Sequence, residues 1–123
     1  MFVMNDEDVL AGHQQELRRG TVVIAALATL KTPGYGYGLL AVLEKSGLSV
    51  DANTLYPLLR RLEKQGLLSS SWDTTDSRPR KMYSTSDAGR KLLQQLESEW
   101  NSLTQSLNTL RTEDPKNLLK ELS

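Results

Sequence analysis

Residues 53–68 (NTLYPLLRRLEKQGLL) combine regularly spaced leucines with amide, hydroxyl and guanidinium side chains. In a helix that turns by about 100° per residue, the leucines fall on one side and most of the polar groups on the other. Polar and cationic groups near the N-terminus of such a helix can bind base edges and phosphates in the major groove of DNA. The candidate groups are Asn53, Thr54, Tyr56, Arg60, Arg61 and Lys64. Taken alone, the stretch slightly favours the other interpretation, a solvated charged face on an ordinary three-helix domain.

A second cationic group follows directly in the chain. Two short runs with alternating character (LLSSSW and KMYSTS) flank DTTDSRPR, which is rich in turn-forming residues, and this pattern predicts a β-hairpin. Its tip carries Arg78, Arg80 and Lys81, which could hold the DNA backbone or the minor groove. We expect Trp72 to cover the hairpin. The cationic hairpin beside the polar helix face shifts the preference towards nucleic acid.

The charge distribution is consistent with a local phosphate-facing surface. The chain contains 15 basic and 15 acidic residues, so its formal net charge is zero. Residues 54–91, however, contain eight basic and four acidic residues. A positive excess confined to one segment is compatible with binding to phosphates, and equally with an ordinary solvated charged face.

The elements that must position these groups follow from periodicity and from helix-stop signals. A first helix is predicted from about Gln14 to Pro33-Gly34, and a second from Gly36 to Lys45. The third helix is residues 53–65, where Pro57 requires either a helix start close to Thr54 or a bend. Ser86 is expected to cap a fourth, long helix.

The element order α-α-α-β-β-α predicts a winged helix-turn-helix followed by a long coiled-coil-like helix, a mainly α fold with a small β-hairpin. We expect a flexible acidic arm (1–12), a winged helix-turn-helix domain (13–85), a dimerisation helix (86–112) and a tail (113–123). The dimerisation helix is inferred from apolar positions that recur in steps of three and four, as in a coiled coil. These positions are Leu93, Leu96, Trp100, Leu103, Leu107 and Leu110.

Trp100 occupies one of the apolar positions of the coiled-coil-like pattern, at which a leucine would be enough for packing. The simpler interpretation is a bulky residue in the core of a dimer. The alternative is that two tryptophans, paired across a two-fold axis, form an apolar slot for a small aromatic effector.

No catalytic or metal-binding constellation is found in the sequence. The chain has no cysteine and a single histidine, His13, and the nearby Asp73 and Asp76 lie in a segment of turn formers. We therefore expect neither an enzyme nor a bound metal or cofactor. The apolar run 22–30 is about half the length needed to cross a bilayer, and the N-terminus lacks the pattern of a signal peptide. A cytoplasmic protein with no membrane partner is expected.

Four blocks of the sequence resemble PadR-type transcriptional regulators: LRRGTVVIAALATL, YGYGLL, NTLYPLLRRLEKQGLL and RKMYSTSDAGRKLL. The resemblance implies a bacterial winged-helix protein that dimerises through its C-terminal helix and usually represses transcription. One helix after the wing is similar to the short-tailed branch of the family, some members of which are similar to multidrug sensors. The resemblance adds Tyr37 as a phosphate contact and supports Thr54, Tyr56, Arg60, Arg80 and Lys81. Two residues depart from the family pattern, Gly38 and Thr85.

The function expected from the sequence is a homodimeric, sequence-specific DNA-binding regulator. It is expected to bind a pseudo-palindromic operator in double-stranded DNA as a repressor, with release by an aromatic effector as an additional hypothesis. The competing hypothesis is a winged-helix module that binds protein through the free helix face, without specific DNA binding.

Overall fold

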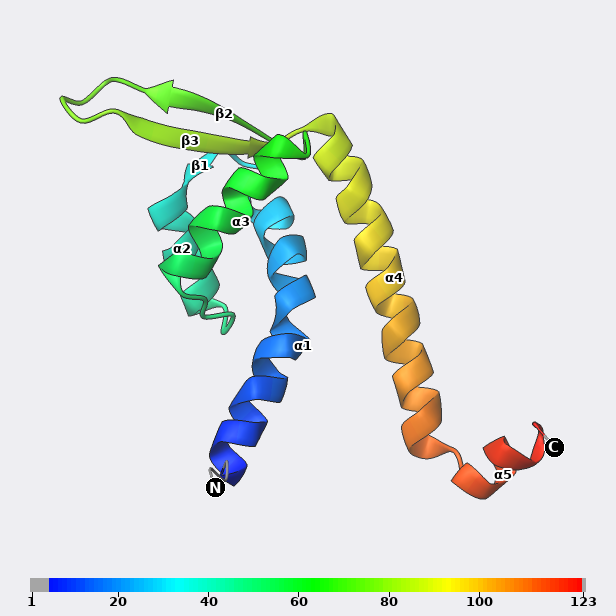
Figure 1. Cartoon of the computed structure of the whole chain (residues 1–123). Coiled ribbons are helices and arrows are strands. Elements are labelled where there is room, and N and C mark those ends of the chain that lie inside the picture. The colour runs from blue at the N-terminus through cyan, green and yellow to red at the C-terminus, as the bar shows by residue number, and fades with distance from the viewer. Residues whose placement is uncertain (1–4, 123) are drawn as a thin grey trace. The chain divides into compact units, whose positions relative to one another are not determined.

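The first helix is longer than the sequence analysis predicts. A computed structural model describes residues 5–122, and in it α1 spans Asp6–Thr29 (Figure 1). The Asn5 side chain accepts a hydrogen bond from the Asp8 backbone N–H at 2.8 Å, and three acidic residues lie in the first turn, near the positive end of the helix dipole. Residues 6–12 are therefore helical and not a loose arm. Residues 1–4 of the predicted arm lie outside the described residues.

The next two helices complete the helix-turn-helix. Helix α2 spans Gly36–Lys45, as predicted, and α3 spans Ala52–Lys64. Asp51 caps α3 by accepting a hydrogen bond from the Asn53 N–H at 2.9 Å, so Pro57 is the sixth helical residue and lies beyond the first turn. An interior proline costs about 3 kcal/mol, and the burial of four leucines on the opposite face offsets that cost.

A three-stranded antiparallel sheet follows, with strand order β1-β3-β2. The predicted hairpin is confirmed as β2 (Leu68–Asp73) and β3 (Arg80–Thr85). Strand β1 (Gly34–Tyr35) was not predicted, because two residues are too few to show an alternating pattern. It pairs with β3 and joins the hairpin to the start of α2 (Figure 1).

The core of the first compact unit, Met1–Leu93, lies among α1, α2, α3 and the base of the sheet. Thr85, a departure from the family pattern, is buried there: its hydroxyl donates to the Leu27 carbonyl and its N–H to the Leu30 carbonyl, both at 2.7 Å. The hydroxyl is thus satisfied, which removes the penalty of an unpaired buried polar group. Thr85 packs below the wing through hydrogen bonds to the end of α1.

Helix α4 spans Asp87–Thr112 and begins where the sequence predicts, with the Ser86 hydroxyl accepting a hydrogen bond from the Gly89 N–H at 3.1 Å. Leu93, predicted as a dimer contact, is only 3% exposed and belongs to the core of the first unit. Its side chain is already covered by its own chain, so it is not available to a partner.

The second unit, Gln94–Ser123, contains the remainder of α4 and the short helix α5 (Pro115–Lys120). On this part of α4, Trp100 is 49% exposed and Leu103, Leu107 and Leu110 are slightly more exposed. Across residues 5–122, no helix is long and apolar enough to cross a membrane.

Candidate nucleic-acid interface

Helix α3 presents the polar face that the sequence predicts. Its leucines Leu55, Leu58, Leu59 and Leu62 are all buried. On the other side of the helix, five of the six predicted contact residues are exposed: Asn53, Thr54, Arg60, Arg61 and Lys64. None of the three cations in this group forms an ion pair within residues 5–122. The face is therefore cationic, and no charged group in the described part of the chain neutralises it.

Tyr56 differs from the other five because it is partly buried. A Cβ atom added at Gly36 would approach the Tyr56 ring to 2.5 Å, so the ring lies directly on the first residue of α2. Only glycine leaves room for this close approach. Tyr56 therefore fixes α2 against α3, in addition to any contact that it makes outside the molecule.

The wing carries a network that the sequence does not reveal. Arg80 of β3 donates through Nη1 to the Tyr37 hydroxyl at 2.8 Å, and its Nη2 lies 3.0 Å from an Asp76 carboxylate oxygen and 3.9 Å from one of Asp73. Its guanidinium carbon lies 4.5 Å from the centre of the Tyr35 ring, which stacks on Tyr37. Arg80 is thus held on three sides and links the wing to α2.

Tyr35 and Asp73 form the other half of this network, across the sheet. The Tyr35 hydroxyl donates to Asp73, which also accepts from the backbone and side chain of Thr75. These hydrogen bonds, that of Tyr35 above all, lower the pKa of Asp73 from its ordinary 3.8 to about 2. The same bond to Asp73 raises the pKa of Tyr35. Asp73 is therefore ionised at neutral pH and supplies negative charge close to Arg80.

Lys81, the neighbouring wing cation, is paired with α3. Its ammonium donates to Glu63 at 2.8 Å, and Ser70 of β2 donates to the same carboxylate. The hydrogen bond from Lys81, followed by that from Ser70, lowers the pKa of Glu63, and the partnership with Glu63 raises the pKa of Lys81. The sequence analysis does not identify Glu63 as part of the site. Its partners, Ser70 and Lys81, lie on strands that follow later in the chain, and no local sequence pattern indicates these contacts.

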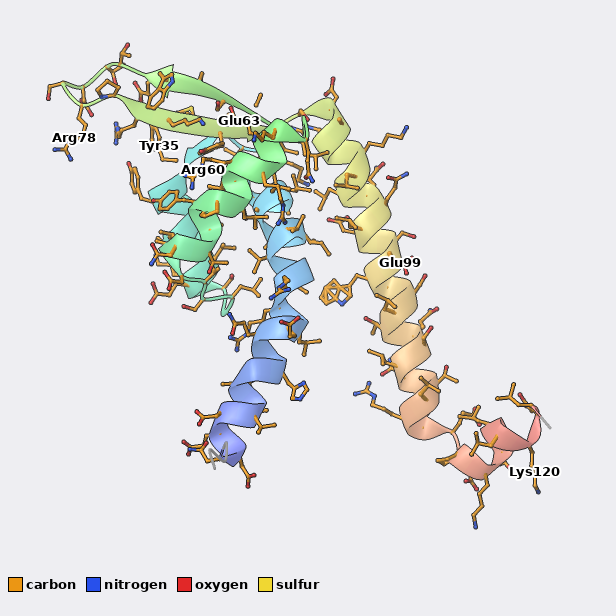
Figure 2. All side chains as sticks on the ribbon, viewed as in Figure 1. Tyr35, Arg60, Glu63, Arg78, Glu99 and Lys120 are labelled. Carbon is orange, nitrogen blue, oxygen red and sulfur yellow. The ribbon has the colours of Figure 1, made fainter. Side chains whose placement is uncertain are left out.

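Arg78 is the wing cation that remains unpaired within the described residues. Figure 2 shows it at the tip of the hairpin, and Arg60 on α3. Tyr37 is 53% exposed beside the wing. Trp72, on β2, is 65% exposed, so most of its side chain is in contact with solvent.

The comparisons with known proteins agree with this geometry. The model of the transcriptional regulator PadR-like family matches residues 23–95, which is more than half of the chain. The chain belongs to the PadR family. This PadR-family protein is 44% identical to a PadR family regulator from Eggerthella lenta, whose crystal structure superimposes with a TM-score of 0.83 over 88% of this chain and 96% of that one.

Two further relatives support the assignment of this PadR-family protein. A PadR-like transcription factor from Bacteroides fragilis is 33% identical, with a TM-score of 0.68 over 80% of this chain and 98% of that one. The transcriptional regulator Rv3488 of Mycobacterium tuberculosis is 42% identical over 59 residues, 48% of this chain. That match spans 55% of the length of Rv3488, about half of it.

Membership of the PadR family assigns the chain to DNA-binding transcriptional regulators with a winged-helix fold and not to enzymes. Within residues 5–122, no group of three or more potential metal ligands is present.

Proposed function

We propose that this PadR-family protein is a homodimeric repressor that binds a pseudo-palindromic operator in double-stranded DNA. The observation that carries the proposal is the cationic face of α3, which is anchored from behind by leucines and has no charge partner within residues 5–122. Two copies of α3 would enter major grooves about one helical turn apart, or a multiple of it. Such a protein works in the cytoplasm, where bacterial DNA lies.

The residues of the proposed interface have different roles. Asn53, Thr54 and the free edge of Tyr56 read base edges, and Arg60, Arg61 and Lys64 bind bases or phosphates. Arg78 holds the backbone from the wing. Arg80 and Lys81 act mainly by holding the wing in position, since both are already bonded within the molecule.

Tyr37 is the proposed phosphate contact at the start of α2. Its hydroxyl oxygen accepts a hydrogen bond from Arg80, which leaves its O–H proton free to be donated to a phosphate oxygen. The Arg80 guanidinium fixes the direction of this hydroxyl and favours a negative partner. Tyr37 and Arg80 therefore act as one unit in this proposal.

The proposed dimer uses the exposed apolar positions Trp100, Leu103, Leu107 and Leu110 of α4, together with Leu96, which is half-buried. Burying them in a two-helix seam removes apolar surface from water, which is the main driving force for association. A chain with Leu103→Glu and Leu107→Glu is expected to be monomeric in analytical ultracentrifugation. A dimer that survives both changes would place the interface elsewhere.

The proposed release by a small aromatic effector rests on Trp100. An effector can release DNA only to the extent that it binds the released arrangement more tightly than the DNA-bound one. Trp100→Ala is expected to abolish release by an aromatic ligand in a DNA-binding assay. Trp72→Ala removes the other tryptophan and serves as the matched control. If an aromatic ligand releases DNA from the Trp100→Ala variant as it does from the parent chain, the paired Trp100 side chains do not form the effector site.

The first experiment measures binding of a labelled DNA fragment from just upstream of the protein's own coding region, by fluorescence anisotropy at two salt concentrations. The operator affinity is expected to exceed that of random duplex and to fall with salt, with a log–log slope of about −0.9 per neutralised phosphate. Binding to neither duplex at low salt would favour the alternative, a module that binds protein. Equal binding to both duplexes would mean that the operator lies elsewhere in the genome.

A further inference from the structure

A cavity of about 600 Å³ lies within the first unit, between α1, the segment before α3, and α3 itself. Its apolar lining is aliphatic and includes Val22, Val50, Pro57 and Leu58. A cavity of this volume, mostly apolar and with a few polar groups, has the dimensions of a small-molecule site.

The lining of this cavity contains more positively than negatively charged side chains. Arg18, Arg19 and Arg61 contribute to its lining, together with one carboxylate, Asp51. Asp51 is engaged in capping α3, and Arg19 is paired with Glu16 at 3.0 Å. Arg18 and Arg61 have no ion-pair partner within residues 5–122. The cavity therefore has a positive excess beside an aliphatic surface.

We propose that this cavity binds an organic monoanion with an aliphatic body and a carboxylate head, such as a medium-chain fatty acid. Arginine binds a carboxylate through two parallel charge-assisted hydrogen bonds, and the hydroxyl of Thr54 in the lining supplies a further donor. The aliphatic lining takes up the chain through the hydrophobic effect. This site lies in a different unit from Trp100 and requires a different class of ligand.

Ligand binding here interferes with DNA binding, because Thr54 and Arg61 belong both to the cavity lining and to the proposed DNA-binding face. A carboxylate on Arg61 removes a cation from that face and adds negative charge beside phosphates. This second part rests on the proposed function, whereas binding of the ligand itself does not.

The test uses isothermal titration calorimetry of the full chain with octanoate, in the absence of DNA. Saturable binding of one octanoate per chain is expected, with octanol and octylammonium bound at least roughly tenfold more weakly because they lack the anionic head. Octanol binding as tightly as octanoate would overturn the proposal, as would the absence of saturable octanoate binding.

Three variants locate the site. Arg18→Gln changes an exposed residue outside the proposed DNA-binding set and is expected to weaken octanoate roughly tenfold, while Lys91→Gln, an exposed charge away from the cavity, leaves binding unchanged. Ser49→Trp places a large side chain in the lining of the cavity and is expected to abolish binding. Loss of octanoate binding in Trp100→Ala but not in Ser49→Trp would place the ligand on α4 and overturn the proposal.

The link to DNA is measured separately, by adding octanoate to the operator complex in the anisotropy assay. A weaker apparent DNA affinity in the parent chain, absent in Ser49→Trp, supports competition. Octanoate that binds in calorimetry but leaves DNA affinity unchanged overturns the competition and leaves the ligand site in place. If the chain binds octanoate but no DNA at all, the proposed function is wrong and the proposed ligand site stands.

Discussion

The exposed face of α3 and the wing contain the same kinds of side chain but hold them differently. On α3, Arg60, Arg61 and Lys64 are exposed and have no charge partner within the described residues. On the wing, Arg80 is bonded to Tyr37 and Asp76, and Lys81 to Glu63. Cations of the same type are therefore left unpaired on α3 within the described residues, whereas Arg80 and Lys81 on the wing of the same unit are paired.

The difference matters because a cation with a close carboxylate has already given up much of its attraction for a phosphate. A phosphate must compete with Asp76 for Arg80, whereas nothing in the described part of the chain competes for Arg60. The comparison teaches that residue type and position near the tip of a hairpin do not identify a phosphate contact. The partners of each cation decide between contact and support.

The largest effect is expected at the unpaired face. Arg60→Ala should weaken operator binding roughly tenfold to a hundredfold, because a base or phosphate contact of arginine is lost with no internal compensation. Fluorescence anisotropy with operator and random duplex measures it, with Lys91→Ala as the control for removing one surface cation. Operator affinity equal to that of the parent chain would show that α3 does not read DNA through Arg60.

The next effect concerns the support of the wing. Arg80→Gln should weaken operator and random DNA alike by several-fold, since it releases Tyr37 and loosens the wing. Adding Tyr37→Phe to Arg80→Gln should then have little further effect, with a coupling energy on the order of 1 kcal/mol in the double-mutant cycle. Strictly additive effects would mean that Arg80 contacts phosphate on its own and not through Tyr37.

A smaller effect is expected at the tip. Arg78→Ala should lower affinity for all duplexes a few-fold and reduce the steepness of the log–log salt slope by about 0.9, the value for one phosphate. Lys81→Met should instead lower thermal stability and leave that slope unchanged, because its partner is Glu63. If the salt slope changes with Lys81→Met and not with Arg78→Ala, then Lys81 contacts phosphate and Arg78 does not.

The smallest effect is the acid dependence of stability. The pKa of Asp73 is lowered from 3.8 to about 2, so folding favours its ionised form. Its contribution is fully present above pH 3.8 and is lost as the pH falls towards 2. Asp73→Asn should remove this part of the acid dependence, seen as a small change in Tm between these values, since the carboxylate remains partly accessible to solvent, which screens its charge. An unchanged profile would contradict the bond between Tyr35 and Asp73.

The sequence predicts the elements whose signals are local. The bounds of α2 follow from its leucine spacing and from Gly47, which ends the turn after it with a φ of 90°. The hairpin follows from the turn formers between its two strands, and the start of α4 from Ser86. Each of these depends on residues within a few positions of one another, where propensity and capping act.

Other features depend on contacts between distant residues and could not be predicted. Strand β1 exists because it pairs with β3 about 48 residues later, as in the register of Gly34 with Tyr83 (83 − 34 = 49) and of Tyr35 with Met82 (82 − 35 = 47). The pairs of Lys81 with Glu63 and of Arg80 with Tyr37 arise in the same way. Leu93 fits the heptad pattern, yet the core of the first unit covers it. The acidic start of the chain looks like an arm by composition, although the same acids stabilise the first turn of α1.

The close packing of Gly89 has a consequence for protein engineering. A Cβ atom at this position would lie 2.1 Å from the Leu67 carbonyl oxygen, so even alanine would force the start of α4 away from the base of the wing. Residues 87–93 are therefore part of the DNA-reading module, although they belong to the last long helix. A chimera that borrows a C-terminal helix from another protein should be joined after Leu93, where the compact unit ends, and not at the Ser86 cap.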